Sequence, residues 1–132
     1  MSEFLTQQEI FTKVVLHLQQ QREPAMHNGT CLYKTKRGLK CAVGCLLEPA
    51  AYSPDLEGVG IGTLLDKNEH LRVKLLRAAL LNSRVDVDDA ETLKLLSQLQ
   101  GIHDACLVED WPARLRDTAK DFNLTMPEAA SA

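Results

Sequence analysis

The spacing of apolar residues predicts an amphipathic helix near the start of the chain. One helical face would collect Ile10, Phe11, Val14, Val15 and Leu18. Thr6 and Glu9 have the spacing of a capping box, in which each side chain satisfies a free backbone N–H of the other residue. Three consecutive glutamines at 19–21 leave the opposite face polar, and the pattern fades before Pro24. The sequence therefore predicts a first helix that begins after Thr6.

A short β-hairpin and a buried helix are predicted next. Cys31–Tyr33 and Leu39–Lys40 flank a polar turn in which Gly38 can adopt a positive φ, as hairpin turns require. The run from Cys41 to Leu47 has almost no polar face and is followed by Pro49, which predicts a short helix inside the core.

Two stretches are rich in turn-forming residues. Asn28-Gly29 is typical of a tight turn. Glu48 to Gly62 contains two prolines and three glycines and is predicted to form a loop. Because compact domains seldom carry long structureless loops, this loop is expected to be functional or to dock on the core.

Helical spacing returns over the second half of the chain. Thr63 to Asn82 predicts a helix in two pieces, with a break near Asp66–Asn68. The acidic run Asp88–Glu91 has a capping pattern and predicts the start of a helix that includes Thr92–Leu107. Asp110–Pro112 predicts the start of a last helix, because proline is favoured in the first helical turn.

Together these elements predict a mainly α fold, a compact bundle of about five to six helices with one small β-hairpin. The 132 residues suit one domain with one core, which we place at 1–124, followed by a frayed tail at 125–132. The predicted helix at 42–47 would lie at the centre, between the first helix and the 92–107 helix.

The composition and charge of the chain indicate which class of protein it belongs to and in which compartment it is found. Hydrophobic residues make up 45% and charged residues 25%, with a net charge of -3, which is typical of a soluble globular protein and argues against a strongly basic nucleic-acid surface. No apolar run approaches the roughly 18 residues of a membrane span. The first residues lack the features of a secretory signal, and four cysteines in such a chain favour a reducing compartment. We therefore expect a cytoplasmic protein with free thiols and no cofactor.

Cys41 is the first candidate for a catalytic residue. It precedes a predicted helix, so the helix dipole and the neighbouring Lys40 would favour its thiolate. A Cys nucleophile needs a base, and His103 followed by Asp104 is the suggested partner, a candidate catalytic set of Cys41, His103 and Asp104. However, adjacent side chains on a helix diverge by about 100°, so Asp104 is not expected to orient the His103 ring. The alternative, that Cys41 and Cys45 simply fill a buried helix, is what free cysteines usually do.

A metal site is the second candidate. Cys41 and Cys45 would share a helical face, and Cys31 and His103 could join them as ligands of tetrahedral zinc. Paired cysteines at the usual zinc-knuckle spacing are missing, so the prediction is that no metal binds, with these four residues as the alternative.

A basic surface is the third candidate. The predicted hairpin carries a group of residues suited to binding an anionic partner, Tyr33, Lys34, Lys36, Arg37 and Lys40. Cationic side chains of this kind contact phosphates or acidic proteins. Because the chain is acidic overall, we expect the partner to be another protein, with nucleic acid as the alternative. The oligomeric state is left open.

Three motifs resemble a family of small uncharacterised proteins from bacterial and phage genomes. They are Cys31-Leu-Tyr-Lys, Gly38-Leu-Lys-Cys-Ala-Val-Gly-Cys-Leu-Leu-Glu-Pro and the later Leu-Gln-Gly-Ile-His-Asp. The resemblance covers about Ile10 to Leu124 and implies that Cys41, Gly44, His103 and Asp104 belong to the family pattern. It implies no particular activity.

Two functions follow as hypotheses. The first is a non-enzymatic accessory or binding protein, of phage or prophage origin, that acts through the basic hairpin and the 48–62 loop. The alternative is a small thiol enzyme with Cys41 as nucleophile and His103 as base. An enzyme requires Cys41 to be partly exposed in a concave pocket and within reach of His103.

Overall fold

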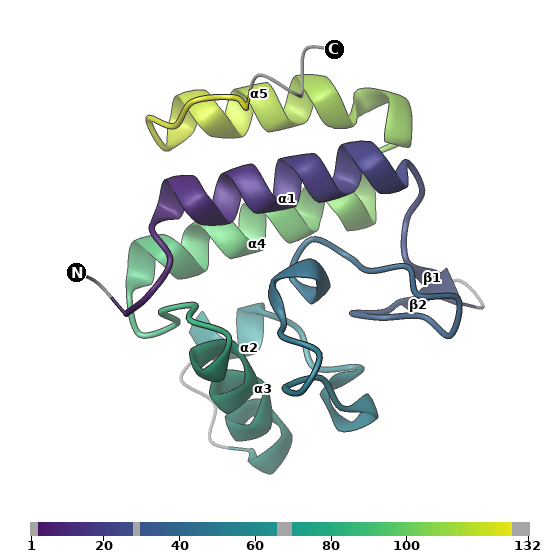
Figure 1. Ribbon diagram of the computed structural model, residues 1–132, viewed down its shortest axis with the longest axis vertical. Helices are drawn as coiled ribbons and strands as arrows, with labels where there is room; N and C mark the ends of the chain where they lie inside the picture. Colours follow the sequence, from purple (N-terminus) through teal and green to yellow (C-terminus); the bar gives the residue numbers. More distant parts are fainter. Residues whose placement is uncertain (1–2, 28–29, 66–69, 128–132) are drawn as a thin grey trace.

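Three long helices form one side of the molecule. The computed structural model describes residues 3–27, 30–65 and 70–127. In it α1 (Gln7–Gln21), α4 (Ala90–Ala105) and α5 (Trp111–Asp121) run side by side, with α4 in contact with both of the others (Figure 1). Below them lie α2 (Gly62–Leu65), α3 (Leu71–Asn82) and the irregular segment that precedes them. The prediction of a mainly α bundle is confirmed.

Local capping chemistry fixes where these helices begin. The Glu9 backbone N–H donates to Thr6 Oγ1 at 3.1 Å, and the Thr6 N–H donates to Glu9 Oε1 at 2.9 Å, so the predicted capping box is present. At α4 the cap is Asp89, which accepts from the Thr92 N–H. Helix α5 begins at Trp111 with a proline in its first turn, as predicted.

The predicted buried helix at 41–47 is wrong in conformation and right in position. All seven residues are buried, and the segment packs against α1. However, only Gly44–Leu46 is helical, as a single 3₁₀ turn, and the Cys45 N–H donates to the Cys41 carbonyl. Seven residues that include a glycine and a β-branched valine have little tendency to form an α-helix, and short 3₁₀ turns are common in such connections.

The predicted hairpin is present as a short antiparallel pairing of 33–35 with 39–41, reduced to a single bridge rather than two strands. Gly38 has a φ of +87°, its N–H donates to the Thr35 carbonyl, and Lys34 and Lys40 face each other in an isolated bridge. The antiparallel pair in the described chain lies earlier, between β1 (Met26–His27) and β2 (Thr30–Cys31). The predicted turn at 28–29 lies outside the described residues.

The 48–62 loop is docked on the body of the protein. It contains a 3₁₀ turn at Pro54–Leu56 that contacts α3, and Leu56 is buried in the core. The helix predicted over 63–82 is divided into α2 and α3 as expected, although the break at 66–68 lies outside the described residues.

The end of the described chain returns to the first helix. Thr125 donates its backbone N–H to Gln8 Oε1 and accepts from Gln8 Nε2, both at 2.8 Å. Thr125, which the prediction placed in a frayed tail, is therefore bound to α1, and residues 128–132 lie outside the described chain. No helix in the described ranges has the length and apolar character to cross a membrane.

Candidate functional site

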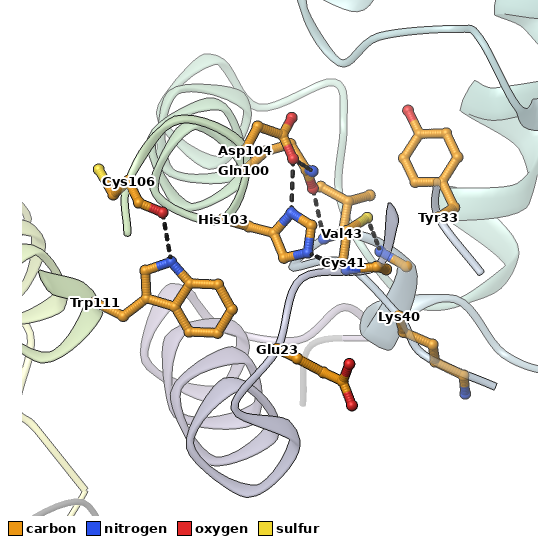
Figure 2. A network of polar contacts seen from close by, with 12 residues as sticks. Glu23, Tyr33, Lys40, Cys41, Val43, Gln100, His103, Asp104, Cys106 and Trp111 are labelled. Carbon is orange, nitrogen blue, oxygen red and sulfur yellow. Dashed lines mark hydrogen bonds and ion pairs between the residues drawn. The ribbon is translucent and has the colours of Figure 1, made fainter. Parts of the chain in front are cut away.

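His103 is a fully buried hydrogen-bonding residue near the end of α4. Its Nε2 accepts the backbone N–H of Ala25 at 2.9 Å, and its Nδ1 lies 2.7 Å from Asp104 Oδ1 (Figure 2). A backbone amide can only donate, so Nε2 carries no proton and Nδ1 carries the proton that is donated to Asp104. The ring also stacks on Trp111, with centroids 5.7 Å apart. Both nitrogens of a neutral imidazole are therefore occupied.

Asp104 gathers three neutral donors around its carboxylate. Besides His103, the Gln100 amide donates to Oδ1 at 2.8 Å, and the Cys31 sulfur lies within 4.8 Å of a carboxylate oxygen. Burial alone would raise the pKa of Asp104, but the hydrogen bonds from His103, Cys31 and Gln100 outweigh it and lower the pKa. The expectation that Asp104 would not orient the His103 ring is wrong, because its carboxylate reaches Nδ1 at hydrogen-bond distance.

Gln100 extends this network to the buried turn at 41–47. Its Oε1 accepts the backbone N–H of Val43 at 3.0 Å, while its Nε2 bonds to Asp104 (Figure 2). The last turns of α4 thus hold three separate segments: the chain at Ala25, the β2 strand through Cys31, and the turn at Val43. We call these polar side chains, Cys31, Gln100, His103 and Asp104, the α4 network.

Cys41 is buried, and its thiol is held in the protonated form. Only 1% of the residue is exposed, and burial raises the pKa of the thiol to about 12. The Gly44 N–H donates to Sγ at 3.2 Å. This hydrogen bond lowers the pKa of the thiol, as predicted, but the desolvation of the buried thiol raises it by more. Cys45 has the same character: burial raises its pKa to about 12, and its thiol donates to the Ala42 carbonyl.

The fold brings the predicted catalytic residues close together, but it does not arrange them as a nucleophile and its base. Cys41 and Asp104 line the same cavity, whereas His103 directs its unprotonated nitrogen at the Ala25 N–H. A general base must present a free nitrogen to the nucleophile, and a reactive thiol needs a lowered pKa. This arrangement resembles a structural network more closely than a nucleophile with its base.

A group of possible metal ligands also forms here. Among the described residues, ligand atoms of Cys31, His103 and Asp104 lie within 4.8 Å of one another. A metal-bound histidine normally donates its second N–H to an acceptor. If Nδ1 of His103 held a metal, the proton would have to sit on Nε2, where it would face the N–H of Ala25. The residues present therefore do not fit a metal ion, and Cys45, whose thiol bonds to Ala42, does not converge with them.

Glu57 holds the 48–62 loop against the chain that leads into the turn at 34–40. Its Oε1 accepts the Tyr33 backbone N–H at 2.9 Å, and its Oε2 accepts the Lys34 N–H at 3.2 Å and the Tyr52 hydroxyl at 2.7 Å. The Tyr33 hydroxyl donates to the Val59 carbonyl further along the loop. The loop and the strand-like segment at 33–34 are thus held as one unit.

Of the residues predicted for binding, the cationic ones are exposed or half-buried, and the tyrosine is buried. Lys34, Lys36 and Arg37 are exposed and Lys40 is half-buried, all on the turn at 34–40, which we call the basic turn. Tyr33 is buried and faces the interior, so it supports the turn from below rather than presenting its ring to a partner. Arg37 forms one long ion pair with Glu23, at 3.7 Å, between two solvent-exposed groups.

The far end of the basic turn is held by α1. The Lys40 backbone N–H donates to Gln21 Oε1 at 2.9 Å, and the Lys40 carbonyl accepts from Gln21 Nε2 at 2.8 Å and from His17 Nε2 at 2.9 Å. Burial lowers the pKa of His17, which bonds as a neutral donor. Both ends of the turn are therefore anchored by side chains that lie far away in the sequence.

A cavity of about 220 Å³ lies between the docked loop and the α4 network. Its walls include the loop from Glu57 to Ile61, the chain at Cys31–Tyr33, and the side chains of Cys41, Gln100 and Asp104. Two carboxylates line it, and none of the described lining residues is a lysine or an arginine.

Two residues of this region, Glu57 and Gln100, were not predicted from the sequence. Gln100 stands four residues before Asp104 on the same helical face, a spacing at which side chains interact, and this signal could have revealed it. Glu57 is an isolated acidic residue in a glycine-rich loop, and no local pattern indicates that it reaches the chain at 33–34.

Comparisons with known proteins supply no relative on which to base a function. No protein-family model, no curated protein and no solved structure matches this chain.

Proposed function

We propose that this chain is a non-enzymatic binding protein that recognises an acidic segment of a partner protein through the basic turn and the docked 48–62 loop. The observation that carries the proposal is the anchoring of the turn at both ends, by Glu57 at Lys34 and by Gln21 at Lys40. Binding to a surface that is already ordered loses less conformational entropy, so fixed charges favour affinity.

The charges on this surface are available to a partner. Lys36 and Arg37 are exposed at the tip, and 74% of the Arg37 side chain is accessible. The long ion pair between Arg37 and Glu23 is of the exposed kind that contributes at most about 1 kcal/mol, so a partner carboxylate can replace it. Beside them the Lys34 ammonium lies over the Tyr52 ring of the loop, 5.6 Å from its centroid, which places the loop within the same surface.

The rival function, a thiol enzyme, finds less support. Cys41 is buried with a pKa raised by desolvation, and the imidazole of His103 has no free nitrogen. An accessory role, with partner recognition in place of chemistry, agrees better with these contacts.

NMR titration of the isotope-labelled chain tests the proposal. A short Glu-rich peptide should shift the backbone amides of 34–40 and of the loop at 48–57, and added salt should reverse the shifts. A peptide of the same length with Gln in place of Glu is the control and should cause no shifts. Absence of binding by the Glu-rich peptide, or shifts centred on α5, would overturn the proposal. Tighter binding of a duplex DNA at the same amides would replace the protein partner with nucleic acid.

A further inference from the structure

The cavity between the docked loop and the α4 network has a charge pattern opposite to that of the basic turn. Glu57 and Asp104 supply two carboxylates to its lining, and the thiols of Cys31 and Cys41 are neutral because burial raises their pKa values to about 11 and 12. With no cationic side chain among the described lining residues, its walls carry a net negative charge.

Asp104 is oriented and ionised without a cationic partner. Its side chain is 37% exposed, and its described partners, His103, Gln100 and Cys31, are all neutral donors. A partly buried carboxylate is most stable beside an opposite charge, and here its described partners provide hydrogen bonds but no counter-charge. A ligand that brings the missing positive charge into the cavity would therefore gain a charge-assisted hydrogen bond.

The rest of the lining suits an organic cation. Tyr33, Val59 and Ile61 line the same cavity and provide buried apolar surface, which a hydrocarbon or aromatic ligand body can contact. Binding pockets typically combine such apolar walls with a few convergent polar groups. A metal ion is the less suitable cation, because the Ala25 N–H occupies Nε2 of His103 and Nδ1 carries the proton donated to Asp104, so neither nitrogen is free to ligate.

We infer that this cavity binds a small organic cation, a primary amine with a compact apolar body, with its ammonium group on Asp104. The site is separate from the basic turn and would operate whether or not the turn binds an acidic partner. The Glu57 contacts hold the loop against the chain at 33–34, and the loop forms one wall of the site.

A matched set of probes tests the inference on the full chain: benzylamine, benzyl alcohol and benzoate. Benzylamine should cause saturable NMR shifts confined to the amides at 31–33 and 57–61 and to the side chain of Gln100. The alcohol and the acid, which share the shape but lack the positive charge, should bind at least about tenfold more weakly, as expected for loss of one charged hydrogen bond.

Two variants test whether the Asp104 carboxylate provides the charge that binds the amine. Asp104→Asn keeps an acceptor for His103 and should weaken benzylamine binding by about tenfold or more. Asp117→Asn, which removes an exposed carboxylate on α5, should leave binding unchanged. If Asp104→Asn fails to fold, the shift map of the unaltered chain decides alone. Equal binding of benzyl alcohol, shifts outside the cavity, or no saturable shift would overturn the inference, as would Zn²⁺ perturbing Cys31 and His103 where benzylamine does not.

Discussion

Nδ1 of His103 lies 2.7 Å from Oδ1 of Asp104, so two consecutive residues of α4 share a hydrogen bond inside the fold. The ring is fixed on its other side by the Ala25 N–H at 2.9 Å. Together these contacts set the tautomer of His103 and connect the end of α4 to the chain that follows α1. The imidazole links these two segments through a hydrogen bond at each ring nitrogen. Because both nitrogens are engaged, the buried ring is not available as a base.

Replacement of His103 should therefore reduce stability. In His103→Ala the Ala25 N–H loses its buried acceptor and a cavity opens beside Trp111, so the free energy of unfolding should fall by about 3 kcal/mol. Chemical denaturation followed by circular dichroism measures this change. Unchanged stability would show that the imidazole is not the connector that the distances indicate. The ring ¹⁵N shifts of the unaltered protein provide a second check and should show the Nδ1–H tautomer.

Gly44 is required for a close approach of two backbone segments. A Cβ at this position would lie 1.9 Å from the Tyr33 carbonyl oxygen, so Gly44→Ala must displace the buried turn. We expect a loss of about 3 kcal/mol or more in unfolding free energy. Gly101→Ala is the matched control, because a Cβ on this exposed residue of α4 meets open space, and it should stabilise the helix by about 0.5–1 kcal/mol. A similar effect of both substitutions would contradict the close contact.

Alkaline pH should destabilise the protein through its buried thiols. Burial raises the pKa values of Cys41 and Cys45 from 9.0 to about 12, so the folded state holds these protons more tightly than the unfolded state. Their contribution to stability is complete below pH 9 and is lost as the pH rises through 12. The loss should reach about 3 kcal/mol per thiol near pH 11.

Denaturation of the Cys45→Ala variant over the same pH range provides the comparison. Its stability should decrease less steeply with pH than that of the unaltered protein between pH 9 and pH 10, and the tyrosines, which also begin to titrate there, are common to both proteins. Identical slopes would show that the Cys45 thiol is not buried in the protonated form.

Glu57 should control the order of the docked loop. Glu57→Ala removes the acceptor of the Tyr33 and Lys34 amides and of the Tyr52 hydroxyl, so hydrogen exchange of the amides at 50–61 should accelerate by at least about tenfold. Glu48→Ala is the control, since Glu48 is an exposed residue of the same loop. Unaltered exchange in the Glu57 variant would contradict its role as the anchor.

The features that the sequence reveals are those with local causes. The capping box of Thr6 and Glu9 and the positive φ of Gly38 depend on neighbouring residues, and both were predicted from the sequence. The pKa of Cys41 was expected to fall because local dipole and charge effects were considered, whereas tertiary burial determines its actual direction. The contact of Glu57 with Tyr33 spans 24 positions, and such a contact depends on how the loop packs.

The central claim, that the basic turn is a binding surface for an acidic partner, is tested most directly by charge reversal. Fluorescence anisotropy of a labelled Glu-rich peptide should show affinity for the unaltered chain and a loss of at least about tenfold in Lys36→Glu/Arg37→Glu. The matched control, Arg114→Glu/Arg116→Glu, reverses two exposed charges on α5 and should retain most of the affinity. Equal losses in both variants, or none in the first, would contradict the assignment of the basic turn as the binding surface.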